Sequence, residues 1–373
     1  MSRIQDALQG IYEWASKADY AGHDPHDLLL APALRRIKRP MVRLIALQLG
    51  RRSVLNLHTF LRVPRSENSK ALALFLSGLL RAGESVTPDW KRDAEGLALR
   101  LMRAMRSAGW GYPFPWQSRT HFLPVETPNI VSTAFAGEAL LDYYEAMPSP
   151  AVFEALRVSA AYIASLEVPN TPFVAFGYAA NDPQIVFNAS LLGAHFLRRA
   201  GVVLSNEQYI ERARRAAEFV RAHQRPDGGW SYGMEPSQQW EDSFHTGFII
   251  VAMKSIAEAI GDARLAEAAV RGFEYYRRSY LEPDFAVRYF PDRRYPIDSH
   301  ALGQALITFS VFGDEPSARR IAEWSIEHLR SPEGFFYYQR HRLFTNRIPY
   351  LRWSNAWMFR GLAEIVTPNE TAL

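Results

Sequence analysis

The stretch WEDSFHTGFIIVAMKSI (240–256) places polar residues directly before a helix that is apolar on nearly all sides. The same arrangement recurs at a period of about 55 residues, and a fixed period indicates a repeat architecture. The related stretches are NIVSTAFAGEALLDYY (129–144), IVFNASLLGAHFLRRAG (185–201), YPIDSHALGQALITFSVFG (295–313) and LRWSNAWMFRGLAEI (351–365). Positions in register are Thr133, Asn188, Ser243, Asp298 and Trp353, and, two residues on, Phe135, Ser190, His245, His300 and Asn355.

A second kind of helix lies between these stretches, with apolar residues on one face and arginine and glutamate on the other. Such helices have one side in water, whereas a helix that is apolar all round is buried on both sides. They fall at 150–167, 206–224, 263–281 and 315–330, and the segments 68–83 and 88–107 supply a further buried and amphipathic pair. The alternation predicts an inner ring of helices wrapped by an outer ring.

The predicted fold is therefore all-α, an (α/α)6 toroid of six helical hairpins with short β-hairpins in its loops. Residues 68–373 form the ring, and residues 1–67 are predicted as N-terminal helices that pack on it within one domain. Short connectors, such as those at Gly201 and Gly261, close one end. Long aromatic loops occupy the other end, where the functional site is expected.

Composition excludes several chemistries. The chain of 373 residues has no cysteine, and only five of its 43 basic residues are lysine. Arginine pairs well with carboxylates and phosphates, so an anionic ligand and plain compositional drift are both open explanations. Basic runs are too short to favour nucleic acid. The N-terminus lacks a signal-peptide pattern and apolar runs are too short to span a membrane, so a cytoplasmic protein is expected.

Three aromatic loops resemble one another: Gly109-Trp110-Gly111-Tyr112, Gly229-Trp230-Ser231-Tyr232 and Gly334-Phe335-Phe336-Tyr337. With the polar-capped inner helices they are similar to the six-hairpin toroid superfamily, over roughly residues 68–367. That superfamily includes uronyl hydrolases, uronate polysaccharide lyases, sugar epimerases and exopolysaccharide-cluster proteins. Terpene cyclases and prenyltransferases share the ring, but this chain has neither an Asp-x-Asp-Asp motif nor a cysteine for zinc. The resemblance thus favours carbohydrate chemistry, and neither a cofactor nor a metal is predicted.

Candidate catalytic residues stand at the starts of the inner helices. A glycosidase needs two carboxyl groups across the scissile bond, although each carboxylate could equally serve as a helix cap. His245 and His300 occupy equivalent repeat positions, where histidine could act as a general base, neutralise a uronate or simply pack in the core. The carboxylates are Glu126, Asp182, Glu241, Asp242 and Asp298.

A second set of residue types suits elimination from a uronic acid, or epimerisation. Tyr232 could remove the proton, and Asn129 or Asn188 could neutralise the substrate carboxylate, as in uronate lyases of the superfamily. Predicted substrate contacts are the loop tryptophans Trp110, Trp230, Trp240 and Trp353, with Trp116 nearby, Arg288 and Arg340 among the loop arginines that also include Arg119, and Asn355. Indoles stack on sugar rings, but these could also fill gaps between hairpins, and the arginines could be solvated loop charge.

The predicted function is an enzyme that acts on an acidic, uronate-containing oligo- or polysaccharide, in exopolysaccharide metabolism. Hydrolysis ranks slightly ahead of β-elimination and epimerisation. The alternatives are a non-catalytic component that binds or assembles glycans, and, less favoured, a cyclase or prenyltransferase-like toroid. The sequence leaves the oligomeric state open.

Overall fold

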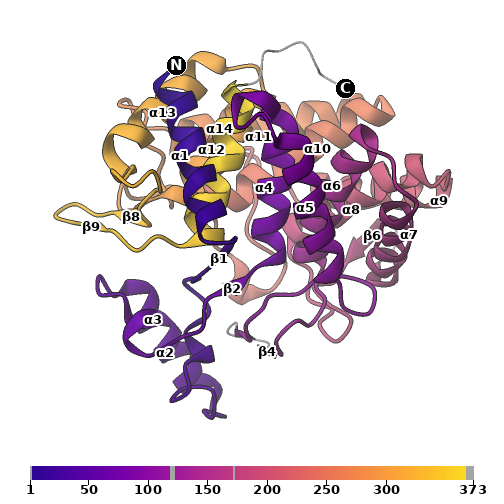
Figure 1. Cartoon of the computed structure of the whole chain (residues 1–373). Helices are drawn as coiled ribbons and strands as arrows, with labels where there is room; N and C mark the ends of the chain where they lie inside the picture. The colour runs from indigo at the N-terminus through magenta and orange to yellow at the C-terminus, as the bar shows by residue number, and fades with distance from the viewer. Residues whose placement is uncertain (1, 118–121, 171–172, 367–373) are drawn as a thin grey trace.

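An inner ring of helices forms the centre of the molecule. The computed structural model describes residues 2–117, 122–170 and 173–366, so Arg119 lies outside the described residues. α14 packs against both α12 and α4, so the inner ring closes on itself (Figure 1). The inner helices are α4 (Ser69–Ala82), α6 (Ile130–Ala146), α8 (Phe187–Val203), α10 (Ser243–Ile260), α12 (Ser299–Val311) and α14 (Trp357–Val366). The predicted (α/α)6 toroid is confirmed.

The outer ring consists of amphipathic helices, each of which buries one face against the inner ring. The outer helices are α5 (Trp90–Arg103), α7 (Pro150–Ser165), α9 (Glu207–Ala222), α11 (Ala263–Tyr280), α13 (Glu315–Leu329) and α1 (Arg3–Lys17). Five of them follow an inner helix in the chain. The sixth hairpin is made from the two ends of the chain, because α1 packs against α14. The N-terminal helix therefore belongs to the ring itself.

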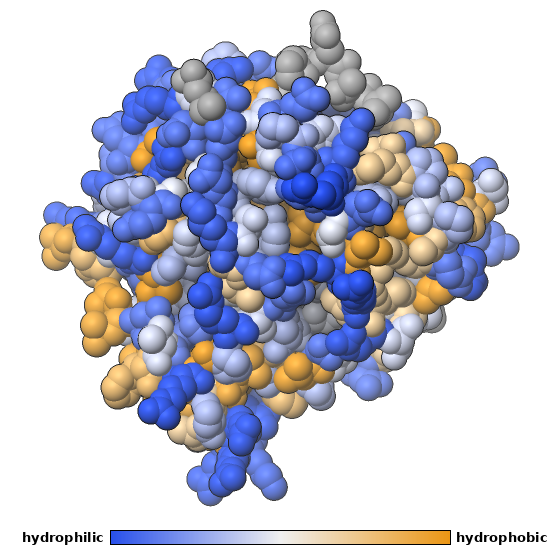
Figure 2. Space-filling model, viewed as in Figure 1, coloured by the Kyte–Doolittle hydropathy of each residue, from blue (hydrophilic) through white to orange (hydrophobic). Residues whose placement is uncertain are grey.

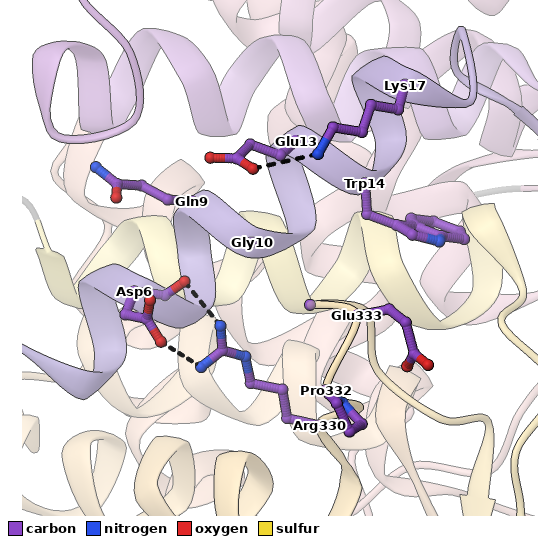
Figure 3. A pocket seen from close by; sticks show the side chains of 10 residues that line it. Asp6, Gln9, Gly10, Glu13, Trp14, Lys17, Arg330, Pro332 and Glu333 are labelled. Carbon is purple, nitrogen blue, oxygen red and sulfur yellow. Dashed lines mark hydrogen bonds and ion pairs between the residues drawn. The ribbon is translucent and has the colours of Figure 1, made fainter.

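In this last hairpin, the backbone of α1 closely approaches the segment that follows α13. Arg330 donates to the carboxylate of Asp6 at 2.5 Å and to its carbonyl oxygen at 3.1 Å, at the wall of a side pocket (Figure 3). Gly334 has φ +95, and a Cβ there would come within 2.9 Å of the carbonyl oxygen of Gly10. Glycine at both positions lets α1 approach the segment that follows α13.

The apolar composition of α10 follows from its place in the inner ring. It is long and apolar enough to cross a membrane by length and composition, but it lies between α8 and α12 as an inner helix of the ring. Asp242 caps its first turn by accepting from the His245 N–H at 2.9 Å, and Gly261 ends it in the left-handed conformation, φ 68.

Short antiparallel strands occur in the long loops, as predicted. β3 (Trp116–Gln117) pairs with β4 (Phe122–Leu123), and β5 (Glu167–Asn170) pairs with β6 (Phe173–Phe176). The third set joins β7 (Ile297–Asp298), β8 (Gln339–Arg340) and β9 (Thr345–Asn346) in that order. These loops and the N-termini of the inner helices define the mouth of the ring.

One further strand pair lies outside the loops that the sequence indicated. β1 (Ala21–Gly22) pairs with β2 (Ser66–Glu67), which brings the two ends of the intervening segment together. This segment, residues 23–65, is called the excursion here. It contains η1 (Leu28–Leu30), α2 (Pro40–Arg52) and α3 (Leu57–Phe60), and it projects from the ring at the end where β1, β2 and β4 lie (Figure 1).

The excursion has a small core of its own, made by Leu28, Leu29, Ala31, Leu47 and Val63. The main core fills the space between the two rings and inside the inner ring. The remaining short helical turns are η2 (Gly83–Ser85), η3 (Pro236–Gln238) and the π-helical η4 (Leu351–Ala356), which leads into α14.

Candidate active site at the mouth of the ring

An aspartate and a histidine pair at the start of α10. The buried carboxylate of Asp242 accepts from the backbone N–H of His245 at 2.9 Å and lies 2.8 Å from its Nδ1. The cap and the side-chain pair use the same carboxylate because both groups lie in the first helical turn. Asp242 therefore holds His245 in the tautomer with hydrogen on Nδ1, which leaves Nε2 as an acceptor. His245 keeps 21% of its side chain exposed, so a ligand at the mouth can reach it.

Two aromatic side chains flank this pair. Tyr232 and Trp240 stack with ring centres 4.4 Å apart, and Tyr232 lies edge-on to His245 at 4.8 Å. Trp240 is 40% exposed, which gives the mouth an open aromatic platform. Burial raises the pKa of the Tyr232 hydroxyl above its ordinary value, and the charge of Asp242 raises it further. The Tyr232 hydroxyl therefore stays protonated, so it is not suited to remove a proton.

His300 lies deeper, at the equivalent position of α12. Its ring stacks on Phe244 at 4.2 Å and on Trp357 at 4.5 Å, and neither ring nitrogen has a hydrogen-bond partner among the described residues. Burial lowers the pKa of His300 well below its ordinary value, and the charge of Lys70 lowers it further. The ring is thus neutral and buried, beneath the more exposed His245.

Lys70 occupies the axis of the ring. It comes from the first turn of α4, and its ammonium lies 4.1 Å from the ring centre of Phe135 and 5.0 Å from that of Trp357. These rings belong to α6 and α14, on other parts of the inner ring. Burial lowers the pKa of Lys70 well below its ordinary value, and Arg352 lowers it further. The described part of the chain offers Lys70 no ion-pair partner, so an anion there would stabilise its charged form.

Asp298 holds the aromatic wall of the mouth in place. Its carboxylate accepts from the His300 N–H at 2.8 Å, from Gln339 Nε2 at 2.7 Å and from Trp353 Nε1 at 3.1 Å. Burial raises its pKa to about 6, although these hydrogen bonds act in the opposite direction. With 0% of its surface exposed, Asp298 positions Trp353 and is not open to a ligand in this structure.

The excursion supplies residues that sequence analysis missed. Asp24 forms a buried bidentate pair with Arg352, with distances of 2.5 and 2.8 Å, and the charge of Arg352 overcomes burial to lower the pKa of Asp24. The ring of His26 lies 5.0 Å from that of Trp353, and Arg51 lies 5.8 Å from the same indole. The sequence does contain a signal for Asp24. Four ionisable residues lie close together in the stretch His23-Asp24-Pro25-His26-Asp27.

Several predicted site residues have local partners. Glu241 accepts from Arg225 at 3.0 Å, in a cluster with Tyr275 of the outer helix α11, and so points toward the outer ring. Arg288 pairs with Glu282 at 2.7 Å within its own loop. Arg340 lies half-buried on β8, and Glu126 pairs with Arg106.

The structure gives Trp110 and Trp230 a packing role. Both are buried, and their indole N–H groups bond to the carbonyl oxygens of Leu101 at 2.7 Å and Val220 at 2.8 Å. They fill gaps between hairpins, which was the alternative to a substrate contact. Asn355 is likewise buried, and it bonds to both backbone groups of Phe336.

Three other polar residues surround the mouth. Asn129 caps α6 by accepting from the Ser132 N–H at 2.9 Å, and Asn188 is buried in the first turn of α8. Asp182 was expected to begin α8, but that helix begins at Phe187 because Asp182 lies in a turn that pairs with Ala179. Across the described ranges, no group of three or more histidine, aspartate or glutamate side chains is arranged to hold a metal.

The arrangement defines a six-hairpin α/α toroid with a histidine-containing polar cluster at its mouth. No family model matches the chain, and no curated protein matches it in sequence. Solved structures do share its fold. Cellobiose 2-epimerase from Bacillus thermoamylovorans is 11% identical, with a TM-score of 0.65, over 82% of this chain and 90% of that one.

Two further solved structures show the same fold. Unsaturated glucuronyl hydrolase from Bacillus sp. GL1 is 13% identical, with a TM-score of 0.61, over 96% of this chain and 94% of that one. The GH76 α-mannanase from Bacteroides thetaiotaomicron is 13% identical, with a TM-score of 0.60, over 81% of this chain and 87% of that one. The chain therefore has the fold of the six-hairpin toroid superfamily.

Proposed function

We propose that the chain is a carbohydrate-active enzyme that transfers a proton at a sugar carbon of an acidic glycan. The observation that carries the proposal is the Asp242–His245 pair, in which a buried carboxylate orients a partly exposed histidine beside the Trp240 platform. A histidine held in one tautomer by a carboxylate is a suitable general base near neutral pH. The carbohydrate chemistry of the proteins that share the fold supports the same class of substrate.

The proposed substrate is a uronate because two buried basic side chains near the mouth have polar groups without a partner among the described residues. Lys70 lacks a counter-ion within the described residues, and the Nε of Arg51 lacks a hydrogen-bond partner there. A substrate carboxylate would supply the missing negative charge. Trp240 would stack on the apolar face of a sugar ring.

In the proposed reaction Nε2 of His245 takes the proton from the carbon next to the substrate carboxyl group. The electron pair of that C–H bond moves toward the carboxyl group, whose developing charge Arg51 and the protonated form of Lys70 would stabilise. From there the reaction has two outcomes. In one, as in a lyase, that electron pair forms a carbon–carbon double bond while the glycosidic oxygen on the neighbouring carbon leaves with the electrons of its own C–O bond. In the other, as in an epimerase, a proton returns to the opposite face of the carbon. Tyr232, with its raised pKa, is the proposed donor for either the leaving oxygen or the carbon.

Hydrolysis is the second candidate, and the raised pKa of Asp298 favours it. A carboxyl group with a pKa of about 6 resembles the general acid of a glycosidase. Its carboxylate, however, already accepts from Gln339 and Trp353 and is fully buried. The sequence ranked hydrolysis slightly first, whereas the geometry gives more support to proton transfer.

The test is incubation of the protein with uronate oligosaccharides in D2O. Proton transfer at carbon predicts deuterium in the sugar if the product is an epimer, and a conjugated double bond with ultraviolet absorbance if the product is an elimination product. New reducing ends without either signal would indicate hydrolysis and would contradict the proposal. Tight glycan binding without any turnover would support the non-catalytic alternative. An acidic substrate, a place in exopolysaccharide metabolism and a cytoplasmic location stay predictions.

A further inference from the structure

The excursion differs from the rest of the chain in charge. Residues 23–65 contain nine basic residues and two aspartates, Asp24 and Asp27, both of which are buried, whereas the whole chain carries a net charge of +4. The excursion therefore has a net charge of 9 − 2 = +7, and the remaining residues carry 4 − 7 = −3 together. Seven of the nine are exposed, and none of those seven forms an ion pair within the described ranges. They are Arg35, Arg36, Lys38, Arg39, Arg52, Arg62 and Arg65.

The same segment exposes apolar side chains in a helical pattern. On α2, Met41 is 68% exposed, Ile45 55% and Leu49 64%, and their spacing of four residues places them on one face. Leu47 and Gly50, on the other face, are buried against the small core of the excursion. α2 thus turns one apolar face inward and another outward.

More exposed apolar residues lie next to α2. Leu55 and Phe60 are exposed around α3, and Leu343 is exposed in the β8–β9 hairpin. Asn346 of β9 donates to the carbonyl oxygen of Ser53 at 2.9 Å, which joins this hairpin to the excursion. Figure 2 shows hydrophobic side chains gathered at the lower left, over the β8–β9 hairpin and α3, with hydrophilic ones between them. We call Met41, Ile45, Leu49, Leu55 and Phe60 the apolar face of the excursion, and Leu343 of the β8–β9 hairpin adds to it from the ring.

We propose that the excursion docks the protein on an anionic membrane surface. Apolar side chains on a helix flanked by many basic residues suit the boundary between acyl chains and anionic headgroups, because the bilayer accepts both kinds of group at once. A nucleic acid would neutralise the charge but would leave Met41, Ile45 and Leu49 in water. A second copy of the chain would cover these side chains but would bring the seven exposed basic residues of each copy to the same contact. The proposal is independent of the reaction at the mouth.

The test measures co-sedimentation of the full chain with vesicles of phosphatidylcholine alone or mixed with phosphatidylglycerol, at low and high salt. We expect binding to the anionic vesicles that weakens with salt and is at least ~10-fold weaker for the neutral ones. The combined variant Arg35→Gln, Arg36→Gln, Lys38→Gln and Arg39→Gln should lose binding on the order of 100-fold or more. The variant Met41→Ser, Ile45→Ser and Leu49→Ser should also lose binding, since the apolar part of the contact is removed.

Matched variants control for general effects of charge and hydrophobicity. Replacing exposed Arg3, Lys91, Arg103 and Arg319 by glutamine removes the same charge elsewhere, and replacing exposed Leu99, Val202 and Val270 by serine removes similar apolar side chains. Both controls should bind anionic vesicles as the wild type does. The proposal would be overturned by equal binding to neutral and anionic vesicles, by wild-type binding of both excursion variants, or by tighter binding to single-stranded or duplex DNA than to the vesicles. A dimer abolished by the serine variant, without vesicle binding, would assign the face to self-association and also overturn it.

Discussion

At the residue scale, the Asp242–His245 pair combines a helix cap with a catalytic arrangement. Replacing Asp242 by asparagine retains an acceptor for the His245 N–H but removes the carboxylate that fixes the tautomer of the ring. We expect Asp242→Asn to lower kcat about 100-fold or more, with little change in KM, because general base catalysis of this kind contributes ~10²–10⁴. Steady-state kinetics on the substrate found in the D2O experiment measures this.

The matched control is Asp262→Asn. Asp262 caps the outer helix α11 by accepting from the N–H groups of Arg264 and Leu265, at 2.9 and 3.2 Å, and pairs with no histidine. Both variants should unfold at nearly the wild-type temperature, since asparagine is a good cap. Equal kcat for the two variants would show that Asp242 only caps α10.

Asp298 predicts an unusual pH dependence of stability. Its pKa is raised from 3.8 to about 6, so the folded protein binds this proton more tightly than the unfolded chain does. The stability that it contributes is therefore full below about pH 4 and is lost as pH rises through 6, by ~3 kcal/mol in all. Asp298→Asn removes this loss, so the free energy of unfolding of the variant should rise relative to that of the wild type between pH 4 and 7.

Urea denaturation at several pH values in that range measures the difference. Asp292→Asn, at an exposed aspartate in the loop before β7, is the control and should show no such trend. A wild-type-to-variant difference that is constant with pH would mean that Asp298 ionises as an ordinary carboxyl group does.

At the element scale, an ion cluster joins the inner helices α6 and α8. Glu138 lies 2.7 Å from Nδ1 of His195 and 2.6 Å from Arg199, which also contacts Asp142 and Glu145 at 2.7 Å. Burial alone would raise the pKa of Glu138, but the charges of His195 and Arg199 overcome it and lower the pKa to about 2. The cluster therefore contributes stability at neutral pH that is lost as pH falls from about 4.5 toward 2.

Breaking this cluster should cost more than breaking a pair in water. We expect Arg199→Met to lower the free energy of unfolding at pH 7 by about 2 to 3 kcal/mol, because it leaves the largely buried Glu138 and the half-buried Asp142 without their shared arginine. The cost should shrink toward pH 3. Arg157→Met, which breaks the exposed pair with Glu154 on α7, should leave stability unchanged within error. Similar denaturation curves for the two variants would contradict this account.

At the scale of the whole molecule, the excursion is separable from the ring but completes its mouth. Gly22 and Ser66 are paired on β1 and β2, so an Asn-Gly turn can replace residues 23–65. We expect this variant to form the ring, since the excursion has its own core, and to show the helical circular dichroism of the remaining chain. It should lose at least ~100-fold in turnover, because Asp24, His26 and Arg51 no longer position Arg352 and Trp353.

Turnover at the wild-type rate in this deletion variant would show that the ring alone forms the site. Loss of the helical signal would instead show that the ring needs the excursion to fold. The same variant also tests the membrane proposal, which predicts that the variant no longer binds anionic vesicles.

The sequence by itself determined the toroid. A helix buried on two faces is apolar nearly all round and a helix buried on one face is amphipathic, so the alternation of the two patterns identifies the inner and outer rings. It also placed Asp242, His245, Asp298 and His300 at helix starts, since capping is local and repeats with the register. It did not show that α1 closes the ring, because that contact joins residues more than 300 positions apart, such as Asp6 and Arg330.

Only the tertiary structure decided which polar residues share the mouth. Lys70 meets aromatic rings of other inner helices, and Arg352 pairs with Asp24 across 328 positions of sequence. The tertiary structure also separated Trp110 and Trp230, which are buried by packing, from Trp240, which lies further along the loop of Trp230 and is exposed. Periodicity records whether a side chain is buried, whereas a site depends on which distant side chains meet, and that is set by how the ring closes and what covers its mouth.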